Sequence, residues 1–295
     1  MTTEDQRFAT GPEHAVCPLC GADKPRKGKW YDFYPFRVVQ CSACHLWYLN
    51  KRLPEKRMLN FYASKEYFRG GGKHGYLRQQ GSYPDQEVCL KLTFRRFLAQ
   101  LNVLGMTGGK LLEIGCGYGY LLEEARPLFD SLTGCDFDAD AVQRIKRLGL
   151  CGIHGGLEAL PTDVQYNTIV STNVVEHVYD PVGFVKKLSL HLKAPGWMVF
   201  ATPKMNSVWF KLLQRRWPSF KVPEHVAYYD PFTLGHLFQQ CQAREMRTLS
   251  LSHAYPLGLI AWKLKLRLPG WLSRYPVWLP DTVFAVAARF DTDAN

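Results

Sequence analysis

The chain has 295 residues, of which 46% are hydrophobic and 21% are charged, with a formal net charge of +11. These values are ordinary for a globular protein with a sizeable core, so they exclude a disordered or fibrous chain. No apolar run reaches the ~18–20 residues of a membrane-spanning helix, and the polar opening MTTEDQRFATGPEH lacks a secretory-signal pattern. We therefore expect a cytoplasmic protein.

Two Cys-x-x-Cys pairs, Cys17/Cys20 and Cys41/Cys44, flank the aromatic stretch WYDFYPFRVVQ. This spacing predicts a zinc ribbon, in which two turns of a small hairpin bring four thiolates to one zinc ion. Four thiolates leave no position open for water, so the ion is expected to be structural. A vacant site and redox dithiol chemistry are the alternatives. The other five cysteines are scattered through apparent core segments, which favours a reduced compartment over a disulfide framework.

Changes in composition divide the chain into four parts. We expect a flexible leader over 1–14, the zinc ribbon over 15–52, a helical linker or lid over 53–105, and an α/β domain over 106–295. The last part carries two aromatic and basic insertions, over 204–229 and 253–281.

The α/β domain is predicted from alternating strand and helix patterns. Strands are expected near 110–114, 131–136, 150–154, 166–172, 196–202, 244–252 and 282–290, and helices near 119–129, 138–148, 181–192 and 231–242. Such alternation predicts a doubly wound, mainly parallel sheet with right-handed crossovers.

The first strand of this block leads into a glycine turn. The stretch KLLEIGCGYG places Glu113 in the strand and then Gly115, Gly117 and Gly119 in the turn, where the backbone can approach a ligand closely. Asp136 ends the next strand, where an acid can accept hydrogen bonds from both ribose hydroxyls of an adenosine ligand. The pyrophosphate spacing G-x-G-x-x-G is absent, which argues against a dinucleotide and for a cofactor without pyrophosphate.

These motifs, with NVVEHV at 173–178, resemble those of the class I S-adenosylmethionine-dependent methyltransferases. The paired cysteines narrow the resemblance to members with an N-terminal zinc ribbon, which often act on sugars or glycans, including nucleotide-sugars. The resemblance is strong over about residues 105–205. It implies a Rossmann-like fold with a seven-stranded sheet whose last strand is antiparallel, and S-adenosylmethionine as the cofactor.

The resemblance also implies a set of cofactor-binding residues. They are Glu113, Gly115, Gly117, Gly119, Asp136, Phe137, Leu157, Glu158, Asn173 and Val174. Asp136 is expected to bind the ribose and Phe137 to pack on the adenine. Where the family commonly has an acid, this chain has Gly156, so adenine recognition is expected at the Leu157 backbone, and Glu158 either helps or is a surface acid.

Candidate catalytic residues come from two segments. PEHVAYYDPFTL at 223–234 resembles the family's acceptor-side motif and offers His225 as general base, because an imidazole has a suitable pKa, with Glu224 helping or substituting for it. Glu176 and His177 in NVVEHV are the second choice, and a structural role is the alternative for both segments. Lys204 departs from the family pattern and is a candidate contact for an anionic acceptor.

Other residues bear on the acceptor. Tyr62 and Tyr67 are candidates for packing or for covering the active site, as the resemblance implies. The net charge is +8 over 1–105, −2 over 106–205 and +5 over 206–295, so the basic flanks either bind an anionic partner or solvate the surface. The Trp-rich basic segment 257–279 is either a lid or a peripheral membrane contact.

The predicted function is O- or C-methylation of a small-molecule acceptor, expected to be an anionic sugar, nucleotide-sugar or glycan precursor. A small-molecule or lipid-quinone methyltransferase is the first alternative. A zinc-ribbon protein that binds or modifies nucleic acid is an alternative of another class, although no dense basic run supports it. The oligomeric state is left open.

Overall fold

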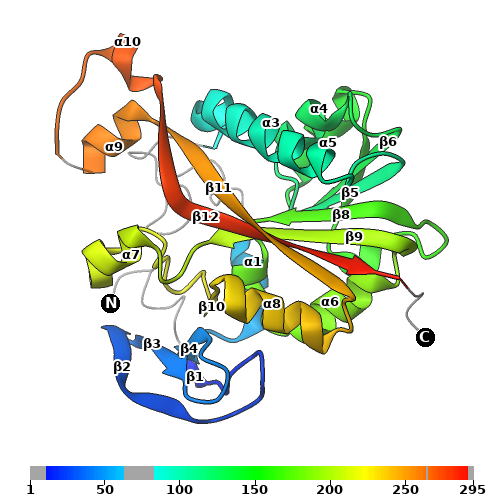
Figure 1. Ribbon diagram of the computed structural model, residues 1–295. Coiled ribbons are helices and arrows are strands. Elements are labelled where there is room, and N and C mark those ends of the chain that lie inside the picture. The colour runs from blue at the N-terminus through cyan, green and yellow to red at the C-terminus, as the bar shows by residue number, and fades with distance from the viewer. Residues whose placement is uncertain (1–10, 63–82, 264, 292–295) are drawn as a thin grey trace.

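The computed structural model describes residues 11–62, 83–263 and 265–291. Two sheets organise this part of the chain, a small one near the N-terminus and a large one that carries most of the helices (Figure 1). None of the described helices is long and apolar enough to cross a membrane.

The large sheet has seven strands in the order β11-β12-β9-β8-β5-β6-β7. Their bounds are β5 Lys110–Ile114, β6 Ser131–Asp136, β7 Cys151–His154, β8 Tyr166–Thr172, β9 Leu192–Pro203, β11 Glu245–Pro256 and β12 Pro276–Phe290. Strands β5 to β9 run parallel, and β12 is antiparallel to both β9 and β11. This confirms the predicted Rossmann-like, seven-stranded methyltransferase fold.

Helices cover both faces of this sheet, α3, α4 and α5 on one and α6 and α8 on the other (Figure 1). Their bounds are α3 Glu87–Val103, α4 Tyr120–Ala125, α5 Ala139–Arg147, α6 Pro181–Ser189 and α8 Pro231–Gln240. The helix predicted over 119–129 is wrong at its end: α4 stops at Ala125, because Pro127 has no N–H to donate to the Glu123 carbonyl and so cannot continue the helical hydrogen-bond ladder.

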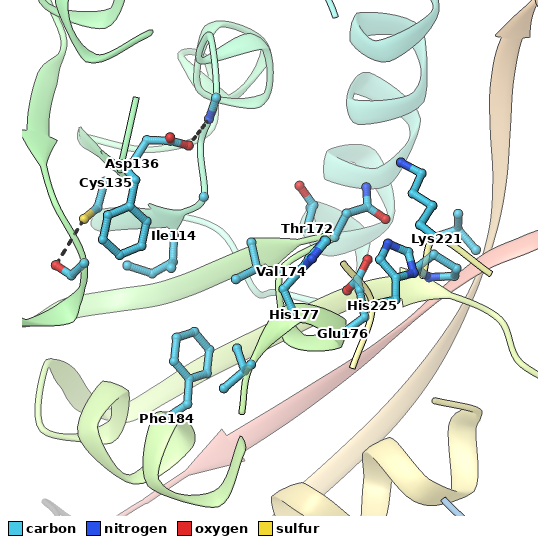
Figure 2. Close-up of a pocket in the computed structure, with 18 of the residues that line it drawn as sticks. Ile114, Cys135, Asp136, Thr172, Val174, Glu176, His177, Phe184, Lys221 and His225 are labelled. Atoms are coloured by element: carbon cyan, nitrogen blue, oxygen red, sulfur yellow. Dashed lines mark hydrogen bonds between the residues drawn. The ribbon is translucent and has the colours of Figure 1, made fainter. Parts of the chain in front are cut away.

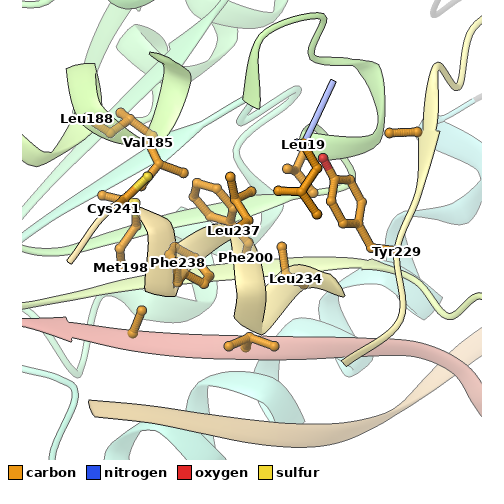
Figure 3. Packing of buried hydrophobic residues seen from close by; sticks show 14 of the residues in the cluster. Leu19, Val185, Leu188, Met198, Phe200, Tyr229, Leu234, Leu237, Phe238 and Cys241 are labelled. Atoms are coloured by element: carbon orange, nitrogen blue, oxygen red, sulfur yellow. The ribbon is translucent and has the colours of Figure 1, made fainter. Parts of the chain in front are cut away.

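Alternation along the strands explains the two-sided core. In β9, Met198 and Phe200 join one buried cluster while Val199 and Ala201 join the other, as a period of two requires. Figure 3 shows Phe200 against Phe238 of α8, whose ring centroids lie 5.0 Å apart.

The N-terminal sheet is built on the cysteine turns. Its strands are β1 Glu13–His14, β2 Pro25–Phe33, β3 Phe36–Cys41 and β4 Trp47–Arg52, joined by β10 Ala227–Tyr228 from the predicted insertion. The two sheets share a core, because Leu19 packs beside Tyr229 in the same buried cluster as Phe200 (Figure 3). The insertion 204–229 therefore ties the N-terminal module to the larger domain; it also contains α7 Val208–Leu213.

The second insertion differs from its prediction. Strands β11 and β12 remain paired as far as Pro256 and Pro276, so the strands predicted over 244–252 and 282–290 were too short. The extended hairpin projects from the body and carries two short helices, α9 Leu257–Lys263 and α10 Gly270–Ser273, at its end (Figure 1). Pro269 immediately precedes α10, and its missing N–H prevents one continuous helix across 257–279.

Candidate functional site

A cavity of about 930 Å³ lies at the carboxyl ends of the parallel strands. Open α/β sheets bind ligands at this edge because the turns after the strands converge there. Figure 2 shows Ile114 and Asp136 on one side of the cavity, Thr172 and Val174 in the middle, and Glu176, His225 and Lys221 on the other side.

The glycine turn forms one wall. Gly115 and Gly117 line the cavity with φ of +72° and +49°, a left-handed conformation that favours glycine. A Cβ at Gly115 would lie 2.3 Å from the Val174 side chain. Gly119 does not line the cavity and has a packing role instead. A Cβ added at Gly119 would lie 2.9 Å from the Ile145 side chain, so glycine here allows α4 to pack closely on α5.

Asp136 is held rigidly at the end of β6. One carboxylate oxygen accepts a hydrogen bond from Gly117 N at 2.7 Å, and the other accepts from Asp138 N at 2.9 Å. Burial raises the pKa of Asp136, while these backbone N–H groups lower it. Glu113 lies behind the turn, is 2% exposed and does not line the cavity, so its predicted cofactor contact would have to be indirect.

The predicted adenine side of the cavity is formed by Phe137 and by the turn at Gly156. A Cβ at Gly156 would lie 2.8 Å from the Phe137 ring, so glycine at that position allows the ring to pack against the turn. Leu157 and Glu158 also line the cavity, in a short 3₁₀ helix. The Glu158 carboxylate accepts a hydrogen bond from Gly156 N at 2.9 Å and therefore caps its own turn.

The middle of the cavity is formed by the residues that directly follow β8. Asn173 and Val174 both line it, as their predicted role requires. Asn173 adopts φ of +55°, and its N–H donates to the Ala201 carbonyl at 2.8 Å, which fixes the exit of the strand.

Glu176, His177 and His225 form a buried cluster at the far side (Figure 2). The rings of His177 and His225 meet edge to face, with centroids 4.7 Å apart. His177 Nδ1 donates to the Glu224 carbonyl at 3.0 Å. Burial lowers the pKa of His177 to about 3 and that of His225 well below its ordinary range. Both imidazoles are therefore neutral near pH 7, which a proton acceptor requires.

The two carboxylates beside these rings differ. Glu176 lines the cavity, accepts from Thr202 Oγ1 at 2.8 Å, and has its pKa raised to about 7 by burial. Glu224 is buried but is not among the lining residues, and what it provides is the carbonyl that orients His177. The prediction that Glu224 substitutes for His225 as base therefore lacks geometric support.

Comparison with known proteins identifies the family. A family model described as a methyltransferase domain matches residues 86–244, more than half of the chain. The chain belongs to the methyltransferase domain family. Class I members of this kind use S-adenosylmethionine, and the matched range contains the glycine turn and Asp136.

Curated relatives share only part of the methyltransferase. A ubiquinone biosynthesis O-methyltransferase from Bordetella bronchiseptica is 26% identical over 137 residues, covering 43% of this chain and 57% of the relative. A protein of the same name from Bradyrhizobium diazoefficiens is 31% identical over 153 residues, covering 50% of this chain and 52% of the relative. The chain thus spans about half the length of the curated relatives it matches.

Solved structures support the fold of the methyltransferase. An S-adenosylmethionine-dependent methyltransferase from Archaeoglobus fulgidus superposes with a TM-score of 0.51 at 16% identity, covering 72% of this chain and 96% of its own. Magnesium protoporphyrin IX methyltransferase from Synechocystis PCC 6803, with bound S-adenosylhomocysteine, superposes with a TM-score of 0.52 at 14% identity. The match covers 80% of this chain and 99% of that one. At these identities the likeness concerns the fold alone.

Two groups of side chains in the described part of the methyltransferase could hold a metal ion. In the first, the Sγ atoms of Cys17 and Cys44 lie 3.4 Å apart and those of Cys20 and Cys41 lie 3.6 Å apart. These separations fit a tetrahedron with Zn–S bonds of ~2.3 Å.

The second group is Glu176, His177 and His225, whose potential ligand atoms lie within 4.8 Å of one another. The charge of Lys221 lowers the pKa of both histidines, and the same positive potential opposes a cation. The arrangement is therefore better suited to proton transfer than to metal binding.

Some site residues of the methyltransferase were missed by the sequence analysis. Tyr83 lines the cavity and stacks on Tyr120, with ring centroids 5.3 Å apart. No local pattern in the sequence points to Tyr83, because its contact with Tyr120 joins segments separated by the strand β5. Lys221 and two residues of β11, His253 and Tyr255, also line the cavity.

Lys204, Tyr62 and Tyr67 are the remaining residues that the sequence linked to the acceptor or to covering the site. Lys204 forms a salt bridge with Asp281 at 2.6 Å and is not among the lining residues, so its contact with an anionic acceptor stays a prediction without support from this geometry. Tyr67 and the side chain of Tyr62 lie outside the described residues.

Glu176 should make stability depend on pH. Its pKa of about 7 in the folded protein exceeds the ordinary 4.5, so between these pH values the folded state binds more protons than the unfolded state. The contribution of Glu176 to the free energy of unfolding therefore falls as the pH rises. The Glu176→Gln variant cannot titrate there. The free energy of unfolding of the variant, measured with denaturant, should therefore rise by roughly 3 kcal/mol relative to that of wild type between about pH 4.5 and 8.5. A pH-independent difference would contradict this expectation.

Proposed function

We propose that the protein transfers the methyl group of S-adenosylmethionine to an oxygen atom of a small, largely apolar acceptor of the phenol or quinone-precursor class. The observation that carries the proposal is a histidine pair, neutral near pH 7, in a cavity with several apolar side chains in its lining. These apolar residues include Leu90 and Phe94 of α3, Leu259 of α9 and Val283 of β12. The relatives named for ubiquinone biosynthesis also support this acceptor class over the sugar or glycan expected from the sequence.

The cavity volume of about 930 Å³ lies at the upper end of the ~300–1,000 Å³ that ligand pockets occupy. The turn at Gly115 and Gly117, with Asp136 and Phe137, would hold the cofactor, which supplies an electrophilic methyl group on its sulfonium sulfur. The opposite side, with Glu176, His177 and His225, is then left for the acceptor.

His225 is the proposed general base. It takes the proton of the acceptor hydroxyl as the new C–O bond forms and the S–C bond breaks, leaving a methyl ether and S-adenosylhomocysteine. His177 packs edge to face against the ring and limits its rotation. Above pH ~7 the ionised Glu176 stabilises the imidazolium that forms, before the proton passes to solvent.

We also propose that Cys17, Cys20, Cys41 and Cys44 bind a structural zinc ion, in a zinc-ribbon module that spans 15–52 beside a linker at 53–105 and the catalytic domain at 106–295. The four thiols suit metal ligation and a reduced, cytoplasmic compartment. The module supports the site directly: Leu49 N donates to the Val226 carbonyl at 2.9 Å, and Val226 N donates to the Glu176 carbonyl at 2.8 Å.

Removal of a zinc ligand should therefore affect both metal content and catalysis. The Cys41→Ser variant is expected to lose the bound zinc, about one ion per chain in wild type, and to lose at least ~10-fold in kcat as the support of Glu176 loosens. Elemental analysis, limited proteolysis and kinetics on the same samples test this. The exposed Cys151→Ser serves as control. Equal zinc in both variants would refute the assignment.

The acceptor class is tested with labelled S-adenosylmethionine and a matched panel. The panel contains catechol-type phenols with and without a prenyl tail, and nucleotide-sugars. Methyl transfer to phenolic oxygen, faster with the tail, is the expected result. Transfer to a nucleotide-sugar alone would overturn the proposal and restore the sugar acceptor.

A further inference from the structure

The end of the β11–β12 hairpin exposes large apolar side chains. We define this surface, the arm tip, as residues 257–263 and 265–275, which include α9 and α10. Trp271 is 79% exposed, Tyr275 62%, Leu266 60% and Trp262 41%. Figure 1 shows both helices standing away from the rest of the chain. Such a concentration of exposed aromatic side chains marks a contact surface.

The arm tip is also basic. Lys265, Arg267 and Arg274 are exposed on it. The sequence contains no acidic residue between Glu245 and Asp281, so nothing within this long stretch offsets their charge. Tryptophan and tyrosine with interspersed lysine and arginine are typical of segments at the interface of a membrane with anionic lipids.

The arm tip is a packed unit. Leu257 N donates to the Tyr275 carbonyl at 2.8 Å, which closes the hairpin beneath the helices. A Cβ on Gly258 would lie 2.9 Å from Ser273 Cβ, so the two helices approach closely. The aromatic side chains are thus presented by a fixed backbone, which reduces the entropy lost on binding.

The same element borders the cavity. Leu259 of α9 lines it, as do His253 and Tyr255 of the adjoining strand. An apolar acceptor held in a bilayer at the arm tip would therefore be close to residues that line the cavity. One structural element therefore carries the exposed surface and also contributes residues to the cavity lining.

We propose that the arm tip docks on an anionic lipid bilayer, with Trp262, Leu266 and Trp271 at the headgroup boundary and the basic side chains on acidic lipid. The link to acceptor delivery rests on the proposed function. The docking itself rests on the exposure, the charge and the geometry of the arm. The bilayer is favoured over a second copy of the chain because a copy would bring the same positive charges together.

The experiment is flotation of the full-length protein with phosphatidylcholine vesicles that contain or lack phosphatidylglycerol. Wild type should float with the anionic vesicles, weakly with the neutral ones, and less at about 0.5 M salt. Trp262→Ser/Trp271→Ser and Lys265→Gln/Arg267→Gln/Arg274→Gln should each partition at least ~10-fold less. Two variants away from the arm tip serve as controls. Phe232→Ser removes an exposed aromatic side chain, and Arg26→Gln/Lys27→Gln/Lys29→Gln on β2 removes the same number of positive charges as the triple variant of the arm tip.

Three outcomes would overturn the docking proposal. Wild type that binds S-adenosylhomocysteine but does not float refutes docking, as does equal loss of flotation in the controls. A dimer in analytical ultracentrifugation that only the tip variants abolish would assign the surface to a second copy. Methylation of a short, water-soluble acceptor is measured on the same samples. If it is absent while flotation persists, the proposed function fails and the docking surface stands.

Discussion

The Asp136→Asn variant is expected to bind S-adenosylhomocysteine about 100-fold more weakly than wild type. The wild-type carboxylate is held at the cavity wall by Gly117 N and Asp138 N, which leaves acceptor capacity directed at a ribose diol. Two hydrogen bonds to a charged group are worth about 3 kcal/mol together, which corresponds to that factor. Calorimetric titration measures it directly.

The control for this variant is Asp163→Asn, an exposed loop acid outside the cavity. It removes the same charge from the chain and should leave the affinity unchanged. Thermal unfolding of Asp136→Asn must show a folded protein, because the lost acceptor also held the glycine turn. Wild-type affinity in a folded Asp136→Asn protein would contradict the assignment of the ribose site.

The His225→Gln variant is expected to retain S-adenosylhomocysteine binding within about 2-fold and to lose ~10²–10⁴-fold in kcat, the usual range for removing a general base. The physical reason is that glutamine fills much of the same space and can hydrogen-bond but cannot accept the proton. Single-turnover kinetics with saturating cofactor and acceptor separate the chemical step from binding.

Two further variants sharpen this test. His177→Gln should cause a smaller loss of kcat, because His177 packs against the base and does not itself take the proton. His236→Gln, on α8 and outside the cavity lining, should behave like wild type. If His177→Gln were the more damaging change, the roles of the two histidines would have to be exchanged.

The local elements of the site follow from short stretches of sequence. KLLEIGCGYG determines a strand, a left-handed turn and a helix start within ten residues, since only glycine adopts the positive φ of Gly115 and Gly117 without strain. Asp136 was recognised because it ends the next strand, and parallel strands bring their carboxyl ends to one edge. The cysteine pairs were recognised by the same kind of local spacing, and their sulfur atoms do converge.

The tertiary structure alone determined how distant segments meet. His177 and His225 are far apart in sequence, and their contact depends on β10 joining β4, a short pairing with no periodic pattern of its own. Glu224 and Lys204 looked suitable by residue type, but the direction of each side chain depends on neighbours such as Asp281 from another strand. The length of the β11–β12 arm was also hidden, because Pro256 and Pro276 suggest strand ends although they pair with each other. Backbone conformation is set largely by near neighbours and could be predicted, whereas side-chain environment is set by packing between distant segments and could not.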